Sequence, residues 1–144
     1  MAEATFTFRL VTPQRLVLEE PIVSLEAPGS EGYLGVLAHH APLVTTLRPG
    51  RLEVRDATGK TSMYAVSGGF LEVSGNRATV LADTAELAEE IDVTRAKSAF
   101  ERAEQRLRGN GGVPTEQQEV DRDRAARALE RARNRMALAA SKRN

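Results

Sequence analysis

The tripeptide Gly59-Lys60-Thr61 is the part of the sequence that most resembles a phosphate-binding motif. A P-loop ends in Gly-Lys-Ser/Thr and needs another glycine five residues earlier, so that its backbone can curl around the phosphates. Val54 stands at that position, and the tripeptide lies between two predicted strands rather than before a helix. We therefore predict that Gly59-Lys60-Thr61 is a hairpin turn.

The two histidines, His39 and His40, are adjacent, and the chain has no cysteine. Neighbouring side chains of an extended segment point to opposite sides, and no acidic cluster accompanies these two, so we predict no metal site. The sequence contains neither a Gly-x-Ser-x-Gly elbow nor a Cys–His pair, which argues against nucleophilic catalysis. The sequence thus predicts a protein that is not an enzyme.

Arg131 and Arg135 are four residues apart in a segment with helical periodicity. Side chains at this spacing share one face of a helix, which suits a basic helix that is solvated or faces a partner. Further arginines surround this helix without aromatic neighbours, which argues against binding of nucleic acid.

The residues before position 89 have the pattern of short strands. Phe6, Phe8 and Leu10 alternate with polar residues, as in a strand with one buried face. Pro49-Gly50 and Ser67-Gly68-Gly69 are typical of turns. On that basis we expect four separate strands at Leu43–Leu47, Arg51–Arg55, Ser62–Val66 and Phe70–Val73. Regular spacing of such pieces predicts a β-sandwich or flattened barrel of about ten short strands.

The pattern changes to a helical one near residue 89. Asp92 is a suitable N-cap, and apolar residues then recur at steps of three and four, which indicates a helix. Gly109–Pro114 would end it, and Thr115 with Gln118 resembles a capping box for a second helix that runs to about Ala140. The sequence therefore predicts an α+β (mainly β) protein, with an antiparallel two-helix hairpin at the C-terminus.

The charge distribution supports the same division, into residues 1–88 and 89–144. Residues 1–91 hold twelve acidic and seven basic side chains, whereas residues 92–144 hold eight acidic and thirteen basic ones. A reversal of sign along the chain indicates a boundary. No apolar run approaches the roughly 18 residues of a membrane helix, and the N-terminus does not resemble a signal peptide. We expect no direct insertion into a membrane.

Two blocks of sequence resemble one known family. Gly29–Val36 reads Gly-Ser-Glu-Gly-Tyr-Leu-Gly-Val and is followed by His-Ala-Pro-Leu at His40–Leu43. Ser67–Val73 and Thr79–Ala85 follow in the same order and spacing as in that family. These blocks are similar to those of the epsilon subunit of the bacterial F-type ATP synthase, and the resemblance extends from about Phe6 to Ala140.

This resemblance implies a non-catalytic subunit of the central stalk, or rotor, that couples proton flow to ATP synthesis. The β-domain would bind the gamma subunit and the c-ring, with Glu31 and Tyr33 facing the ring and His40 near gamma. Tyr33 stands where some relatives carry Glu. The helices would form a mobile arm that reaches the catalytic alpha and beta subunits and inhibits ATP hydrolysis. The protein would be peripheral, at the cytoplasmic face of the inner membrane.

A narrower resemblance concerns ATP. Some members of the family bind ATP on the folded hairpin through an Ile-Asp-x-x-Arg-Ala segment and two arginines four residues apart. The matching residues of this chain are Glu86, Ile91, Asp92, Arg95, Arg131 and Arg135. Since Arg131 and Arg135 share a helix face, the resemblance implies that both guanidinium groups can meet one polyphosphate. The alternative is that Asp92 is only a helix cap and that the arginines contact the beta subunit. The resemblance thus implies no required cofactor but a regulatory ATP, and the alternative function is that of an ATP-sensing module.

Overall fold

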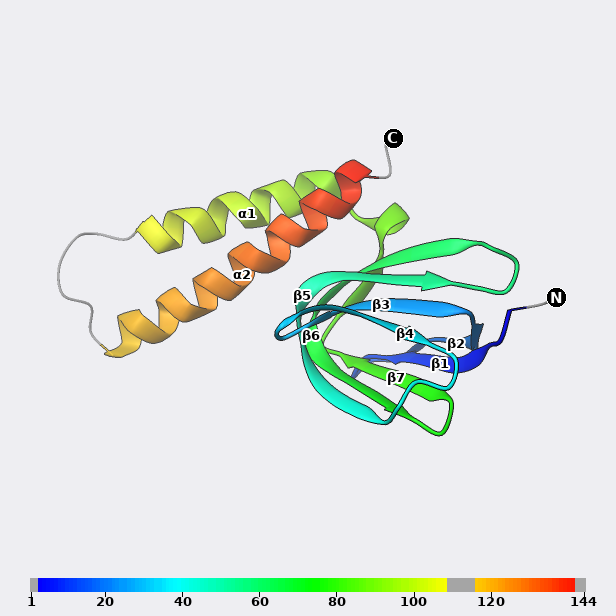
Figure 1. Cartoon of the computed structure of the whole chain (residues 1–144). Helices are drawn as coiled ribbons and strands as arrows, with labels where there is room; N and C mark the ends of the chain where they lie inside the picture. The colour runs from blue at the N-terminus through cyan, green and yellow to red at the C-terminus, as the bar shows by residue number, and fades with distance from the viewer. Residues whose placement is uncertain (1–2, 109–115, 142–144) are drawn as a thin grey trace. The chain divides into compact units, whose positions relative to one another are not determined.

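The computed structural model describes residues 3–108 and 116–141 of the chain. Contacts divide the chain into two compact units, Met1–Ala88 and Glu89–Asn144. The first unit is built from strands and the second from helices (Figure 1). None of the helices in the described ranges is long and apolar enough to cross a membrane.

The first unit is one sheet whose strands share a single core. Its described strands are β1 (Phe6–Val11), β2 (Leu16–Ile22), β3 (Ser24–Gly29), β4 (Gly32–Leu37), β5 (Leu43–Arg55), β6 (Thr61–Ser74), β7 (Arg77–Ala82) and β8 (Ala85–Leu87). The strand order is β2-β1-β7-β6-β5-β3-β4, and β8 pairs with β6. A short 3-10 helix, η1 (Ala88–Glu90), follows.

The core of this unit follows from the alternation of apolar and polar residues. In β1 the side chains of Phe6, Phe8 and Leu10 are buried, and the residues between them are half-buried. Leu25 of β3 and Leu71 of β6 belong to the same cluster, so strands distant in the sheet share one interior. A sheet around one core, followed along the chain by two helices, confirms the predicted class.

The number of strands is smaller than predicted, because β5 and β6 each join two predicted strands. Pro49-Gly50 lies inside β5, where Pro49 stands opposite Ser67 of β6, and Ser67-Gly68-Gly69 lies inside β6. Both sites were predicted to be turns. Proline and glycine also occur where a long strand bends, and Figure 1 shows β5 and β6 as long curved strands.

Gly69 shows why β6 needs glycine at its bend. Its φ is 137°, and a Cβ atom there would lie 2.0 Å from the carbonyl oxygen of Leu81 on β7. Gly68 has a φ of 120°, also in a region that L-residues rarely adopt. At this point β6 exchanges its pairing with β7 for pairing with β8.

The second unit consists of α1 (Val93–Arg108) and α2 (Glu116–Ser141), which pack against each other. The N–H of Arg95 donates a hydrogen bond of 3.0 Å to Oδ1 of Asp92, so the predicted N-cap is confirmed. The predicted capping box at Thr115 and the linker Gly109–Pro114 lie outside the described residues.

The seam between the two helices consists mainly of alanine. Five buried alanines recur at steps of seven, Ala96 and Ala103 on α1 and Ala125, Ala132 and Ala139 on α2, and Leu138 of α2 is buried as well. The larger Leu107 and Leu129 are only half-buried. Because little apolar area is removed from water, the hydrophobic contribution of this seam is small.

Candidate functional site

An exposed row of apolar side chains crosses four strands on the outer face of the sheet. Phe70 on β6 stands opposite Leu81 on β7, and Leu81 stands beside Val11 on β1, which pairs with Leu16 on β2. Phe70, Leu81 and Leu16 are 53%, 51% and 48% exposed. We call these four residues the apolar row. Contiguous exposed apolar side chains are typical of surfaces that bind another protein, a membrane or a ligand.

One further exposed side chain extends this surface on β5. Val44, which is 72% exposed, lies two residues before Thr46, the partner of Phe70. Residues two apart in a strand share a face, so Val44 lies on the same side of the sheet as Phe70. The exposed apolar surface therefore extends from the apolar row onto the start of β5.

Our sequence analysis missed this surface, although a signal was present. Three members of the row are directly adjacent in sequence to a core residue, in the pairs Leu10-Val11, Phe70-Leu71 and Val80-Leu81. Neighbouring residues of a strand point to opposite faces, so an apolar pair places one apolar side chain inside and one outside. Paired apolar residues in several strands of one sheet thus predict an apolar outer face.

The predicted contact residues Glu31, Tyr33 and His40 lie in two separate places. Glu31 is exposed in the two-residue connection between β3 and β4, and Tyr33 follows it on β4. His40 is half-buried and follows the other end of β4. An extended strand of six residues spans about 20 Å, so the structure brings Glu31 and Tyr33 together but separates them from His40.

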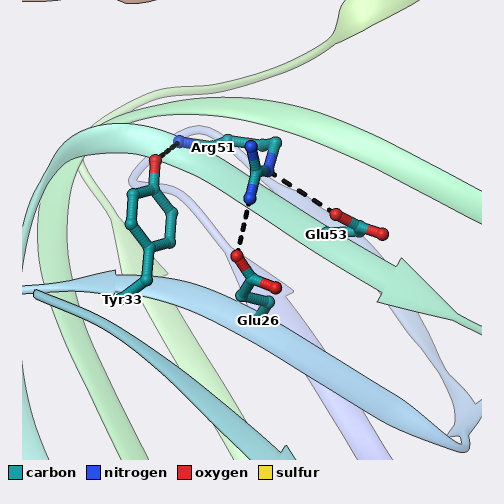
Figure 2. Close-up of polar contacts among 4 residues, drawn as sticks. All are labelled: Glu26, Tyr33, Arg51 and Glu53. Atoms are coloured by element: carbon teal, nitrogen blue, oxygen red, sulfur yellow. Dashed lines mark hydrogen bonds and ion pairs between the residues drawn. The ribbon is translucent and has the colours of Figure 1, made fainter.

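Tyr33 belongs to a polar cluster on the outer face of β3, β4 and β5, which Figure 2 shows. The phenol oxygen of Tyr33 accepts a hydrogen bond of 3.0 Å from the backbone N–H of Arg51, and the Arg51 guanidinium lies 5.1 Å from the centre of the Tyr33 ring. The same guanidinium contacts Glu26 at 2.6 Å and Glu53 at 3.6 Å. These bonds fix Arg51 and hold the 52% exposed Tyr33 ring in one position.

The His40 loop is held by the turn between β6 and β7. His39 has a φ of 64°, and its N–H donates a 2.8 Å hydrogen bond to Oδ1 of Asn76. The Asn76 amide in turn donates to the carbonyl oxygen of Thr5 at 3.0 Å. Nδ1 of His40 lies 2.7 Å from the carbonyl oxygen of Ala41, which leaves Nε2 as the ring nitrogen for a partner.

The residues of the predicted ATP site are only partly brought together. Arg95 is exposed near the start of α1, and Arg131 is exposed and Arg135 half-buried in the later part of α2. Figure 1 shows the start of α1 beside the end of α2, so these arginines lie at the same end of the hairpin. Asp92 is engaged as the N-cap of α1, and Ile91 is buried. Glu86 lies in the first unit, on β8 opposite Ala65.

The segment around Lys60 is the predicted hairpin turn. Oδ1 of Asp56 accepts hydrogen bonds from the N–H and hydroxyl of Thr58 and from the N–H of Lys60. The Thr58 hydrogen bond is the main cause that lowers the pKa of Asp56. Gly59 supplies the positive φ of 89°. Among the described residues, no three His, Asp or Glu side chains gather so as to hold a metal ion.

Comparison with known proteins gives a consistent result for both units. Residues 5–88 match the family described as ATP synthase, Delta/Epsilon chain, beta-sandwich domain, and residues 89–140 match its long alpha-helix domain. The chain is 51% identical over 130 residues to the ATP synthase epsilon chain of Desulforamulus reducens, covering 90% of this chain and 93% of the relative. It is 47% identical over 134 residues to that of Nitratidesulfovibrio vulgaris, covering 93% and 95%.

Solved structures show the same fold. A chain in the Euglena gracilis mitochondrial ATP synthase (OSCP/F1/c-ring) matches with a TM-score of 0.79 and 30% identity, over 95% of this chain and 82% of that one. A chain in the central stalk/c-ring structure of the Tetrahymena thermophila mitochondrial enzyme matches with a TM-score of 0.64 and 17% identity, over 96% and 99%. Together with the sequence matches, these results show that the chain belongs to the ATP synthase delta/epsilon family, and within it to the epsilon chains.

Proposed function

We propose that this chain is a non-catalytic subunit of the central stalk of a proton-translocating ATP synthase. The observation that carries the proposal is the apolar row, because a structural subunit needs a surface that binds a partner rather than a catalytic site. Relatives at about half identity are ATP synthase epsilon chains, and the matching Euglena chain was solved within an F1/c-ring assembly.

The first unit offers two surfaces for two partners. The apolar row, with Val44 and the nearby His40 loop, suits the gamma subunit, because its exposed aromatic and aliphatic side chains have the character of an interface core. Glu31 and Tyr33, at the far end of β4, suit the polar surface of the c-ring. With its two contacts separated along a stiff sheet, the unit would transmit torque from the ring to the stalk.

The helical unit is suited to regulation of the alpha and beta subunits. Its alanine seam gives a small hydrophobic contribution, so α1 and α2 can separate at low cost in free energy. Exposed arginines on both helices, among them Arg95, Arg102 and Arg131, would favour an acidic surface on the catalytic subunits. An arm extended along the stalk would then impede ATP hydrolysis.

A regulatory ATP would act on the equilibrium between packed and separated helices α1 and α2. Arg95, Arg131 and Arg135 lie at one end of the hairpin only while α1 and α2 pack together. A polyphosphate bound by these guanidiniums would therefore favour the packed form, and would shift the equilibrium by its difference in affinity for the two forms. The ATP-sensing function is the second candidate for this unit, and it needs no catalytic group.

Affinity purification from membranes tests the principal proposal. The tagged chain should retain the gamma subunit, the c-ring and the catalytic subunits in constant proportion, and the isolated chain should not hydrolyse ATP. A purified chain that retains no ATP synthase subunits, in membranes where that enzyme is assembled, would contradict the proposal. A chain that binds ATP through its hairpin but retains no ATP synthase subunit would favour the ATP-sensing function.

A further inference from the structure

The strand β4 is an unprotected edge of the sheet. Among the described strands it pairs with β3 alone, and its sequence Gly-Tyr-Leu-Gly-Val-Leu contains no charge and no proline. The opposite edge, β2, carries Glu19, Glu20 and Pro21, which are residues that keep an edge strand from pairing. The contrast identifies β4 as the edge that is open to another strand.

The backbone groups of alternate β4 residues point away from β3. Gly29 and Gly32 flank the two-residue connection, so they form the hydrogen-bonded pair that closes the hairpin. Bonded and non-bonded pairs then alternate, which turns the N–H and C=O groups of Tyr33, Gly35 and Leu37 outward. The carbonyl oxygen of Leu37 accepts a hydrogen bond of 3.2 Å from the N–H of His40, as expected of a group that points away from β3.

The outward residues of β4 are complementary to themselves. If two copies pair antiparallel about a twofold axis at Gly35, the exposed side chains of Tyr33 and Leu37, which are 52% and 62% exposed, face each other twice. The two Gly35 residues meet at the axis, where open space surrounds the position of a Cβ atom. The uncharged strand places no like charges opposite each other.

We propose that the free chain forms a twofold dimer through β4, in which the two sheets join into one. This goes beyond the central-stalk function and is tested without any other subunit. The contact covers one short strand per copy, so it is smaller than a standard interface and should be weak. Since the dimer covers Tyr33, it would exclude the proposed c-ring contact, and the open edge would be paired only until the chain is assembled.

Sedimentation equilibrium of the full chain measures the association. Between about 10 µM and about 1 mM, the mean mass should rise by mass action from the 15.7 kDa of one chain toward twice that value. Leu37→Lys should weaken the dimer at least tenfold, because a charged lysine on an edge strand must lose water on pairing and opposes edge-to-edge contact, at two places in the dimer. Val44→Lys is the matched control at an equally apolar, exposed position away from β4, and should dimerise as the wild type does.

Cross-linking tests the register, since the chain has no natural cysteine. Residues of a hydrogen-bonded antiparallel pair have Cα atoms about 5.5 Å apart, within the range that a disulfide spans. Gly35→Cys should therefore give a covalent dimer under mild oxidation, and Val44→Cys should remain monomeric. A chain that stays monomeric at about 1 mM, or equal cross-linking of both variants, would overturn the proposal.

Discussion

Glu26 on β3 and Glu53 on β5 stand directly opposite each other in the sheet. Like charges in this arrangement repel and destabilise a sheet. The Arg51 guanidinium contacts both carboxylates, and therefore one cation compensates a repulsive pair while it also packs over Tyr33. The polar cluster of Figure 2 is thus a structural unit as well as the support of a proposed contact.

Arg51→Met should lower the free energy of unfolding by about 1–2 kcal/mol at low ionic strength, since it removes the ion pairs and the cation–π contact. Added salt screens the remaining repulsion between Glu26 and Glu53, so the loss should shrink as salt rises. Urea unfolding at several salt concentrations measures the loss of unfolding free energy and its dependence on salt. Arg15→Met, at an exposed position, serves as the control. If the free energy of unfolding lost in Arg51→Met does not depend on salt, the repulsion between Glu26 and Glu53 is unimportant.

Gly69→Ala should prevent folding of the sheet or cost several kcal/mol, because its Cβ would lie 2.0 Å from a backbone oxygen at a φ of 137°. Gly35→Ala is the matched change in β4, where nothing lies within 4 Å of the new atom. Its melting temperature should stay near that of the wild type. Equal thermal stability of the two variants would contradict the close approach of β6 and β7.

A chain that ends at Glu90 should remain a folded β-protein with a cooperative thermal transition. The residues of the core cluster all belong to the first unit, so removal of α1 and α2 leaves that core complete. Circular dichroism measures strand content and cooperativity. An unfolded fragment would show that residues 1–88 depend on the helices and are not an independent domain.

Arg131→Ala and Arg135→Ala should each weaken ATP binding at least tenfold, because each removes a charge-assisted contact with phosphate. Lys60→Ala should leave the affinity unchanged, since its Gly-Lys-Thr is a hairpin turn held by Asp56. Titration calorimetry on the isolated chain gives these affinities. No heat at millimolar ATP would leave the arginines as contacts to partner subunits only.

The sequence predicted the fold class well because apolar alternation in strands and helical periodicity depend on neighbours along the chain. The continuity of β5 and β6 could not be predicted in this way. Pro49 and Gly69 have the local signature of turns, and only their partners, Ser67 on β6 and Ala82 on β7, show that the strands continue. Whether such a segment turns or continues as a strand depends on pairing with residues that are distant in the sequence.

The surfaces were predicted less completely for the same reason. Tyr33 was identified through a motif, but its partner Arg51 is 18 residues away in the sequence, and no local pattern connects them. The apolar row needs the register of four strands. Only the pairing of Phe70 with Leu81, and of Leu81 with Val11, turns scattered apolar residues into one surface.

The most direct test of the central claim is the affinity of the chain for an ATP synthase F1 assembly that contains gamma and lacks its own epsilon subunit. Phe70→Asp places a charge in the middle of the apolar row and should weaken binding at least thirtyfold, about 2 kcal/mol, as expected at the centre of an interface. Leu37→Asp, on β4 and outside the row, should bind within about threefold of the wild type. Wild-type affinity of Phe70→Asp, with an unchanged circular dichroism spectrum, would contradict the account.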